Sequence, residues 1–274
     1  MKAHTEHPDH SRPKHMASRA FELGKSICRR VAPHLTKTLK MYKTLSLDLG
    51  HYKTLKTSSC VDRAGNPLPW YTYPTIEYLR QFDFRDRVVF EFGLGNSTLF
   101  WAQRARRVVA VENDGTWFEQ VSRCAPDNVS CHFAESREAY INYITTCGES
   151  FDVIVIDGFY RRACAGTAIR YLAPDGFIIL DNADWCQETA AFLRSQDLIE
   201  VDMAGFSPIN NYTSTTSLFL RRGVRLVPAG QVHPVPPVGS WPIEQAQADL
   251  EERILPGALV GPAMLAGEPR ARGR

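Results

Sequence analysis

Residues 87–117, which read RVVFEFGLGNSTLFWAQRARRVVAVENDGTW, decide how the rest of the chain is interpreted. The stretch begins with the apolar run Val88-Val89-Phe90, which is typical of a buried strand. It then turns at residues 93–98 and continues as an apolar helical stretch, for which Asn96 or Ser97 is the expected N-cap. A second apolar run ends on Glu112. The pattern predicts a strand, a glycine turn, a helix and a second strand with an acid at its tip.

The spacing of the glycines and acids separates two kinds of ligand. Glu112 follows the first glycine, Gly93, by roughly 20 residues, where a nucleotide-binding unit carries the acceptor for a ribose hydroxyl. A dinucleotide-binding motif also has a third glycine, and this chain has Thr98 at that position. Glu91, two residues before Gly93, would repel a pyrophosphate but suits an ammonium group. An ordinary glycine turn after a strand remains the alternative.

S-adenosylmethionine (SAM) carries a ribose diol and an ammonium group, and it has no phosphate. The run Glu91-Phe92-Gly93-Leu94-Gly95 resembles the first motif of class I SAM-dependent methyltransferases, and Glu112 resembles their ribose-binding acid. The resemblance implies SAM as cofactor, held by these residues: Glu91, Phe92, Gly93, Gly95, Asn96, Ser97, Thr98, Glu112, Asn113, Glu135 and Asp157. Glu135 would accept from the adenine amine, whereas the next residue, Ser136, is better explained as a helix N-cap.

The composition places the chain among soluble globular proteins. It has 274 residues, of which 44% are hydrophobic and 23% charged, and its net charge of +2 gives no reason to expect a nucleic-acid or anionic-membrane partner. No transmembrane segment and no secretory signal is recognisable, so a cytoplasmic location is expected. The seven cysteines are scattered without a CxxC pair, which favours free thiols over disulfides or a zinc site.

Four segments are expected: a disordered tail (1–16), a basic helical arm with a turn (17–69), a SAM-binding domain (70–222) and a Pro/Gly-rich tail (223–274) with one helix. Residues 21–49 carry apolar side chains at helical spacing and would pack on the core or on a partner subunit, giving a homodimer through the arm. A position on a membrane surface is the alternative. Trp70, Tyr71 and Tyr73 could lie at the mouth of the cofactor cleft or pack on the sheet.

From Arg87 onward, strand-like and helix-like stretches alternate, which predicts an α/β, doubly wound and mostly parallel sheet. Seven strands are expected near 87–92, 107–112, 129–134, 151–157, 176–181, 198–203 and 215–221, and helices near 97–105, 115–124, 136–146, 162–172 and 185–195. The last two strands have no crossover helix between them and should pair antiparallel. The resemblance covers about residues 70–222 and implies the strand order 3-2-1-4-5-7-6.

Two neighbouring strands of this sheet end in oxygen-bearing side chains, Asp157 after the fourth and Asp181-Asn182 after the fifth. Ligands bind at this edge of doubly wound sheets, and two carboxylates with an amide oxygen suit Mg²⁺. The arrangement resembles metal-dependent O-methyltransferases of the catechol, caffeoyl-CoA and sugar type, which implies a Mg²⁺ site at Asp157, Asp181 and Asn182. Otherwise Asp157 would contact acceptor or cofactor directly, and Asp181-Asn182 would be a strand-end turn.

The chain departs from that pattern beside the first predicted ligand. The catechol enzymes carry a lysine base three residues after it, and this chain has Tyr160 there, followed by Arg161. Tyr160 could act as a base only with a lowered pKa, and Arg161 could bind an anionic acceptor. Together with Asp157 they are the candidate catalytic residues. The loop 205–213, Tyr160, Trp185 and the aromatic arm are expected to form the acceptor pocket.

The sequence therefore predicts a SAM-dependent methyltransferase that acts on an oxygen of a small-molecule acceptor, with Mg²⁺ as an assisting ion. The alternative is a SAM- or nucleotide-binding domain without catalysis, kept for interaction or regulation. An NAD-dependent enzyme is a weaker third interpretation, because Glu91 and the absent third glycine oppose it.

Overall fold

The computed structural model describes residues 32–242. The chain divides into two units, Met1–Val235 and Pro236–Arg274, and the architecture below belongs to the first. The predicted tail 1–16 and the predicted helix of the C-terminal tail, over 243–254, lie outside the described residues, as does Cys28. The other six cysteines are free thiols, as expected.

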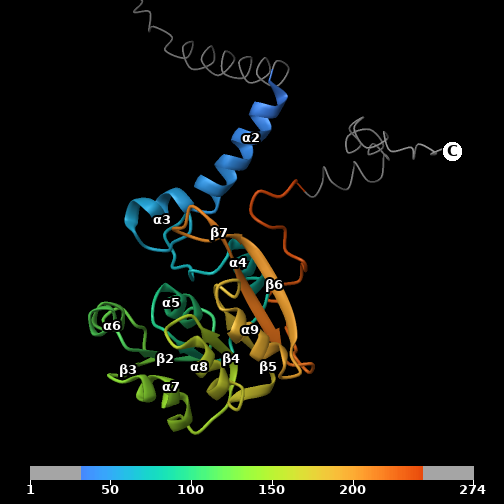
Figure 1. The fold of residues 1–274 in the computed structure, drawn as a ribbon. Coiled ribbons are helices and arrows are strands. Elements are labelled where there is room, and N and C mark those ends of the chain that lie inside the picture. The colour runs from blue at the N-terminus through green and yellow to red at the C-terminus, as the bar shows by residue number, and fades with distance from the viewer. Residues whose placement is uncertain (1–31, 243–274) are drawn as a thin grey trace, which may run out of the picture. The chain divides into compact units, whose positions relative to one another are not determined.

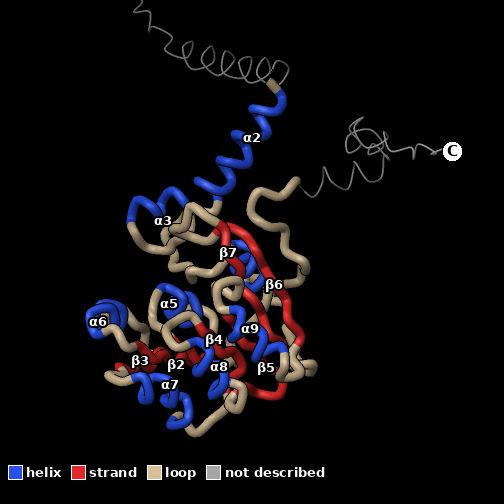
Figure 2. The backbone as a smooth tube through the Cα atoms, viewed as in Figure 1, coloured by secondary structure: helices blue, strands red, loops and turns tan. Residues whose placement is uncertain are grey.

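A seven-stranded sheet forms the centre of the unit (Figures 1 and 2). Its strands are β1 (Val88–Phe92), β2 (Arg107–Glu112), β3 (Val129–Phe133), β4 (Phe151–Ile156), β5 (Leu172–Leu180), β6 (Ile199–Phe206) and β7 (Thr213–Leu220). Their order is β3-β2-β1-β4-β5-β7-β6, and β7 runs antiparallel to both of its neighbours. The predicted fold class, strand order and antiparallel final pair are confirmed.

Helices connect the strands in the predicted alternation. They are α2 (Pro33–Lys43), the π-helix η1 (Thr44–Asp48), α3 (His51–Thr57), α4 (Tyr73–Leu79), α5 (Asn96–Ala102), α6 (Gly115–Ser122), α7 (Arg137–Thr146), α8 (Arg161–Ala168) and α9 (Gln187–Arg194). The boundary between α8 and β5 was wrong: α8 was expected to continue to residue 172, where β5 already begins. Pro174 favours an extended backbone before it, and Leu172 pairs with Phe151 instead.

Side chains alternate between the two faces of the sheet and meet different helices on each. On β1, Val88, Phe90 and Phe92 belong to the hydrophobic cluster that includes residues of α7, α8 and α9. Val89, one position along, belongs to the cluster formed with α4 and α5. Because strand side chains point to opposite faces in turn, Glu91 shares the α5 face with Val89. The sequence therefore directs an acid, and not an aromatic ring, toward the glycine turn.

The chain before β1 divides into an exposed and a buried part. No residue of α2 is buried against the described part of the chain, so the predicted packing of this segment on the core is wrong for α2. Leu68, Tyr71 and Tyr73 are buried in the cluster with α4 and α5, so the two tyrosines pack on the sheet and do not reach the cleft. Thr72 connects this segment to β7, the last strand of the sheet in the sequence, because its amide donates to Thr216 Oγ1 at 2.9 Å.

The segment after β7 was predicted to be a Pro/Gly-rich tail from residue 223, but its first part is bound to the fold. The Asp83 amide donates to the Val227 carbonyl oxygen at 2.8 Å, and the Ala229 amide donates to the Gln81 carbonyl oxygen at 2.8 Å. The Val235 amide donates to Gln81 Oε1 at 3.0 Å. These bonds extend the folded unit beyond the expected boundary at residue 222. Among residues 32–242, no helix has the length and apolar character needed to cross a bilayer.

Candidate functional site

A cavity of about 520 Å³ lies at the carboxyl ends of β1, β2, β4 and β5. Of the predicted cofactor-binding residues, Glu91, Gly93, Gly95, Asn96, Ser97 and Glu112 line it. The predicted metal ligands Asp157, Asp181 and Asn182 line its other side. The structure thus brings the first two strand tips and the fourth and fifth together around one cavity, as a doubly wound sheet should.

Glycine is needed at two places in this wall. Gly93 has φ +115°, and a Cβ atom there would lie 3.3 Å from the Gly158 amide nitrogen. Gly158, after β4, leaves room for Tyr140, because a Cβ atom there would lie 2.0 Å from the tyrosine Oη. Gly95 has an extended backbone and forms the N-cap of α5, with its amide donating to Thr98 Oγ1 at 3.0 Å. The predicted caps, Asn96 and Ser97, are already inside the helix.

Glu91 is fully buried and carries one unsatisfied oxygen. Thr98 Oγ1 donates to its Oε2 at 2.5 Å, whereas Oε1 has no hydrogen-bond partner among the described residues. Burial raises the pKa of Glu91 to about 8; the nearby hydroxyl groups of Ser97 and Thr98 oppose this rise, and the charges of Asp157 and Glu112 add to it. An unpaired buried oxygen is costly, so a ligand that donates to Oε1 gains that energy on binding.

Glu112 anchors the glycine loop. Its Oε2 accepts from the Leu94 amide at 3.1 Å, and its Oε1 accepts from the amides of Asn113 at 2.7 Å and Asp114 at 2.9 Å. A carboxylate has about four lone-pair sites, so these three bonds leave roughly one for a ligand hydroxyl. The predicted ribose acceptor therefore has two functions: it holds the turn in shape and it faces the cavity.

Four predicted cofactor residues do not line the cavity: Phe92, Thr98, Asn113 and Glu135. Phe92 points into the core, and Thr98 lies behind Glu91. Glu135 is exposed, and it makes no hydrogen bond or ion pair within the described part of the chain. Ser136 is the N-cap of α7, as predicted, because its Oγ accepts from the Ala139 amide at 3.1 Å.

Arg161 occupies the position between the tips of β4 and β5. Its Nη2 donates to Asp157 Oδ1 at 3.1 Å and to the Asp157 carbonyl oxygen at 3.0 Å. Its Nη1 donates to the Asp181 carbonyl oxygen and, at 3.3 Å, to Asn182 Oδ1. Its Nε donates to the Gly158 carbonyl oxygen at 3.0 Å. A guanidinium has five N–H groups, and each has an acceptor here, so Arg161 has no donor left for an anionic acceptor molecule.

The two carboxyls at these tips differ in their partners. Burial raises the pKa of Asp157 to about 6, and the Arg161 charge opposes this rise. Burial, with the Asp157 charge adding to it, holds the pKa of Asp181 well above its usual range. Thr216 Oγ1 donates to Asp181 Oδ1 at 2.6 Å and accepts from the Thr72 amide, so Asp181 is fixed from behind by β7 and the N-terminal segment.

The predicted Mg²⁺ ligands do not fit a metal ion as they are arranged. Asp157 Oδ1 and Asn182 Oδ1 both accept from Arg161, so two of the three expected ligand groups already face a protein cation. Within residues 32–242, no group of three or more His, Cys, Asp and Glu side chains is placed to hold a metal ion. The sequence predicted the oxygens correctly but not the guanidinium between them.

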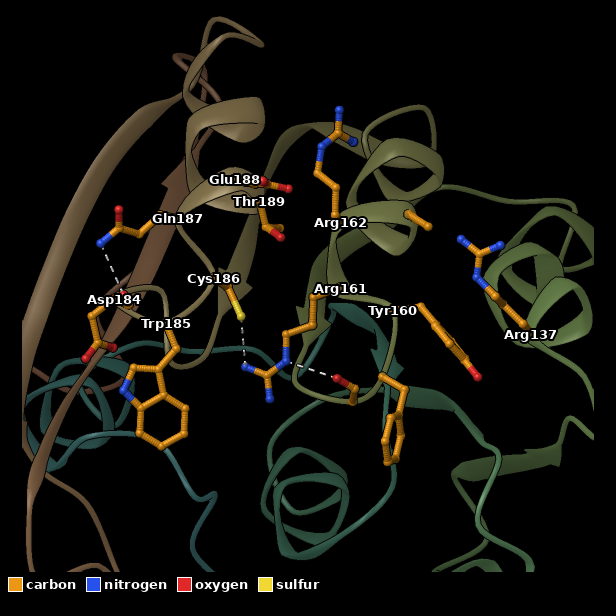
Figure 3. A pocket seen from close by; sticks show the side chains of 13 residues that line it. Arg137, Tyr160, Arg161, Arg162, Asp184, Trp185, Cys186, Gln187, Glu188 and Thr189 are labelled. Carbon is orange, nitrogen blue, oxygen red and sulfur yellow. Dashed lines mark hydrogen bonds between the residues drawn. The ribbon is translucent and has the colours of Figure 1, made fainter.

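A second, more open cavity of about 750 Å³ lies between the first turns of α8 and α9 (Figure 3). Tyr160 lines this outer groove, with the Arg137 guanidinium 5.4 Å from its ring centre, and it is not among the residues of the first cavity. It is the N-cap of α8 with φ 54°. The predicted base is therefore turned away from the site. Phe159, Arg161 and Trp185 line both cavities and separate them.

Exposed aromatic side chains also line the first cavity. Trp70, Trp117, Phe159, Trp185 and Tyr212 each line it and are each exposed. The rings of Trp185 and Tyr212 lie 5.9 Å apart. Tyr212 comes from the loop between β6 and β7, together with Ile209 and Asn210, so this loop lies where it was predicted.

Sequence reasoning missed part of the wall. Ser58, Ser59 and Cys60, from the segment predicted as a separate arm, line the cavity. Asn96 holds them there, because its Nδ2 donates to Ser59 Oγ at 2.9 Å and to the Cys60 carbonyl oxygen at 2.6 Å. No motif marks these residues. Trp117 was also missed, although it follows Glu112 closely and its Nε1 donates to the Leu94 carbonyl oxygen of the glycine turn.

The cavity is strongly acidic. Glu91, Glu112, Asp114, Asp157 and Asp181 line it, and Arg161 is the one basic residue among the described lining residues. Because the Arg161 donors are all engaged, the wall offers carboxyl oxygens and no free cationic group. Such a wall attracts a cationic ligand and repels phosphates.

Comparison with known proteins gives the following findings. No protein-family model matches the sequence, and no curated protein matches it either. Among solved structures, precorrin-6y C5,15-methyltransferase from Geobacter metallireducens is 17% identical, with TM-score 0.38 and coverage of 52% of this chain and 84% of that one. An rRNA methylase from Streptococcus thermophilus is 12% identical, with TM-score 0.39 and coverage of 56% and 97%. The N-methyltransferase NodS from Bradyrhizobium japonicum, in complex with S-adenosyl-L-homocysteine (SAH), is 16% identical, with TM-score 0.38 and coverage of 50% and 78%. Likenesses at this level say nothing about the activity or substrate of this chain.

Proposed function

We propose that this chain is a SAM-dependent methyltransferase. The observation that carries the proposal is the buried Oε1 of Glu91, which lines the cavity and has no hydrogen-bond donor among residues 32–242. The ammonium group of SAM would supply that donor. Glu112, at the tip of the next strand, would accept from the ribose, and the acidic wall suits the positive sulfonium. A pyrophosphate cofactor such as NAD would meet five carboxyls and no free cation.

For the acceptor of the methyl group we propose an oxygen of a neutral, ring-bearing small molecule. The exposed aromatic rings at the mouth offer stacking surfaces, and the cavity offers no free positive charge to an anionic acceptor. The acceptor oxygen would attack the methyl carbon in line with the sulfonium. The carbon–sulfur bond would break with its electron pair on sulfur, giving SAH. Asp157, whose Oδ1 is held by Arg161, would receive the acceptor proton.

The experiment that tests this function has two stages. Isothermal titration should show SAH binding to the full chain, with NAD⁺ binding at least tenfold more weakly, and Glu91→Gln should weaken SAH binding. Transfer of the labelled methyl group of SAM to a pool of neutral hydroxylated ring compounds should then be detectable by mass spectrometry. If SAH does not bind, the assignment fails. Binding of SAH without transfer to any acceptor pool would favour the alternative, a SAM-binding domain without catalysis.

We also propose that the chain forms a homodimer through its N-terminal arm. Leu35, Leu39 and Tyr42 recur on one side of α2, and 58%, 56% and 67% of their surfaces are exposed. A second copy of the same helix would cover this apolar stripe.

A further inference from the structure

We infer that Arg161 is a built-in cation that holds the place of a metal ion between the strand tips. Its guanidinium binds Asp157 Oδ1 and the Asp157 carbonyl oxygen on one side, and the Asp181 carbonyl oxygen and Asn182 Oδ1 on the other. These acceptors are oxygens from two adjacent strand ends, the arrangement that suggested a divalent cation from sequence alone. The positive charge is supplied by the first residue of α8.

The position of this charge explains how two acids can share one edge of the sheet. Asp157 and Asp181 follow neighbouring strands, which lie about 4.8 Å apart. Carboxylates that close repel unless a proton or a cation lies between them. Arg161 lies between the two strand ends, against the Asp157 carboxylate and the Asp181 carbonyl oxygen, with only 19% of its side chain exposed. Its fifth donor is bound to the Gly158 carbonyl oxygen. Its charge therefore balances Asp157 without any exchangeable ion.

Arg161 is consequently a positioning residue, because all of its donors are used by the protein. By holding Oδ1 of Asp157 it fixes the rotation of that carboxyl. The other oxygen, Oδ2, accepts no hydrogen bond within the described part of the chain, and Asp157 lines the cofactor cavity. The same side chain ties the β4 tip to the β5 tip, which a metal ion would otherwise do.

This arrangement predicts a metal site that becomes available when the Arg161 side chain is removed. Removing the guanidinium would leave Asp157 Oδ1, Asn182 Oδ1 and the Asp181 carbonyl oxygen without their shared donor. Carboxylate, amide and carbonyl oxygens with added waters are the ligands that Mg²⁺ and Mn²⁺ take. The wild-type chain should therefore bind no Mn²⁺ at this place, whereas Arg161→Ala should gain a site.

The test is a Mn²⁺ titration of the full chain, in which electron paramagnetic resonance reports the free ion. Arg161→Ala should bind about one Mn²⁺ at least tenfold more tightly than the wild type, which corresponds to about 1.4 kcal/mol of binding free energy. Adding Asp157→Asn to this variant should remove the gained site. Arg162→Ala is the matched control: the neighbouring arginine lies over the Phe192 ring at 3.8 Å, and its loss should leave Mn²⁺ binding as in the wild type.

Three results would overturn the inference. One is a wild-type chain that binds Mn²⁺ and loses it on Asp157→Asn, because the metal would then coexist with Arg161. Another is an Arg161→Ala variant that keeps its wild-type circular dichroism and binds no Mn²⁺. The third is an equal gain in Arg162→Ala. Should Arg161→Ala fail to fold, Arg161→Gln repeats the measurement. The wild-type titration tests the inference independently of either variant. None of these readouts requires methyl transfer, so they are independent of the proposed function.

Discussion

At the scale of single residues, ligand binding should change the protonation state of Glu91. With a pKa of about 8 it carries a proton at pH 7, and an arriving ammonium group favours the carboxylate instead. Binding of SAH at pH 7 should therefore release up to about one proton. Titration calorimetry in buffers of different ionisation enthalpy would measure this release, and Glu91→Gln should abolish it. Equal heats in all buffers would contradict the prediction.

The same raised pKa gives the sign of a stability effect. A carboxyl that binds its proton more tightly in the folded state stabilises the fold most at low pH, where both states are protonated, and loses that contribution as pH rises. The free energy of unfolding of the ligand-free chain should therefore fall between about pH 5 and the folded pKa of about 8, and it should fall less in Glu91→Gln. Urea unfolding at several pH values would test this; parallel curves for the two proteins would rule it out.

Two substitutions of Glu112 distinguish its contact with the ligand from its support of the glycine turn. Glu112→Ala removes both the ligand contact and the acceptor of three backbone amides, so SAH affinity should fall about ten- to a hundredfold. Glu112→Gln keeps one acceptor oxygen and should lose less. Calorimetry on both variants, with circular dichroism as a control of folding, gives the comparison. Unchanged affinity in a folded Glu112→Ala protein would remove this residue from the site.

Single residues also show what a sequence can and cannot predict about a site. Glu91, Glu112, Asp157 and Asp181 were found because each lies at or next to the end of a recognisable strand, and strand ends of a parallel sheet meet at one edge. Arg161 could be located in the chain but not in space. Whether it faces the acceptor or bridges Asp157 and Asn182 depends on its side-chain torsions and on the left-handed turn at Tyr160, which has no sequence signature here.

At the scale of elements, the β4–α8 turn depends on close packing against α7. Gly158→Ala would place a methyl group 2.0 Å from the Tyr140 Oη, whose ring is fixed in the core, and it should cost about 1–3 kcal/mol of unfolding free energy. Gly166→Ala, inside α8, has its nearest atom at 3.6 Å and should stabilise by roughly 0.5–1 kcal/mol. Thermal unfolding of the pair should shift in opposite directions. A Gly158→Ala protein as stable as the wild type would show that the turn is not tightly packed.

The elements themselves were the most predictable level. The strands β1, β2, β4 and β5 contain short apolar runs, and the lack of a helix between β6 and β7 predicted their antiparallel pairing. The errors fell where tertiary pairing overrides local pattern. Residues 172–175 joined β5 because Leu172 pairs with Phe151, and β6 continues to Phe206 because β7 pairs with it to its end.

At the scale of the whole molecule, the folded unit extends beyond the closing strand. A chain cut after Val227 loses the bonds of Ala229 and Val235 to Gln81 and the His233 ring that lies 5.3 Å from Phe82. It should lose about 1–3 kcal/mol of stability but keep SAH binding. A chain cut after Val235 should unfold within about 0.5 kcal/mol of the full chain. Equal unfolding temperatures for both cuts would show that residues 228–235 belong to the tail and not to the folded unit.

The proposed dimer has its own test. Light scattering after size exclusion should give about twice the chain mass of 30.9 kDa, and Leu35→Ser with Leu39→Ser should give the monomer. Met41→Ser is the control, because Met41 is 74% exposed but lies on another side of α2. A wild-type protein that elutes as a monomer at every concentration would end this proposal.

The place of β7 has a consequence for how the protein is made. This strand lies between β5 and β6, yet it is the last of the sheet to leave the ribosome. A nascent chain that has not reached residue 213 carries β5 as a bare edge, a template for pairing with another chain. It also lacks Thr216, which meets both Asp181 and the Thr72 amide. A chain that terminates before β7 is therefore expected to aggregate and not to form a partly folded but functional protein.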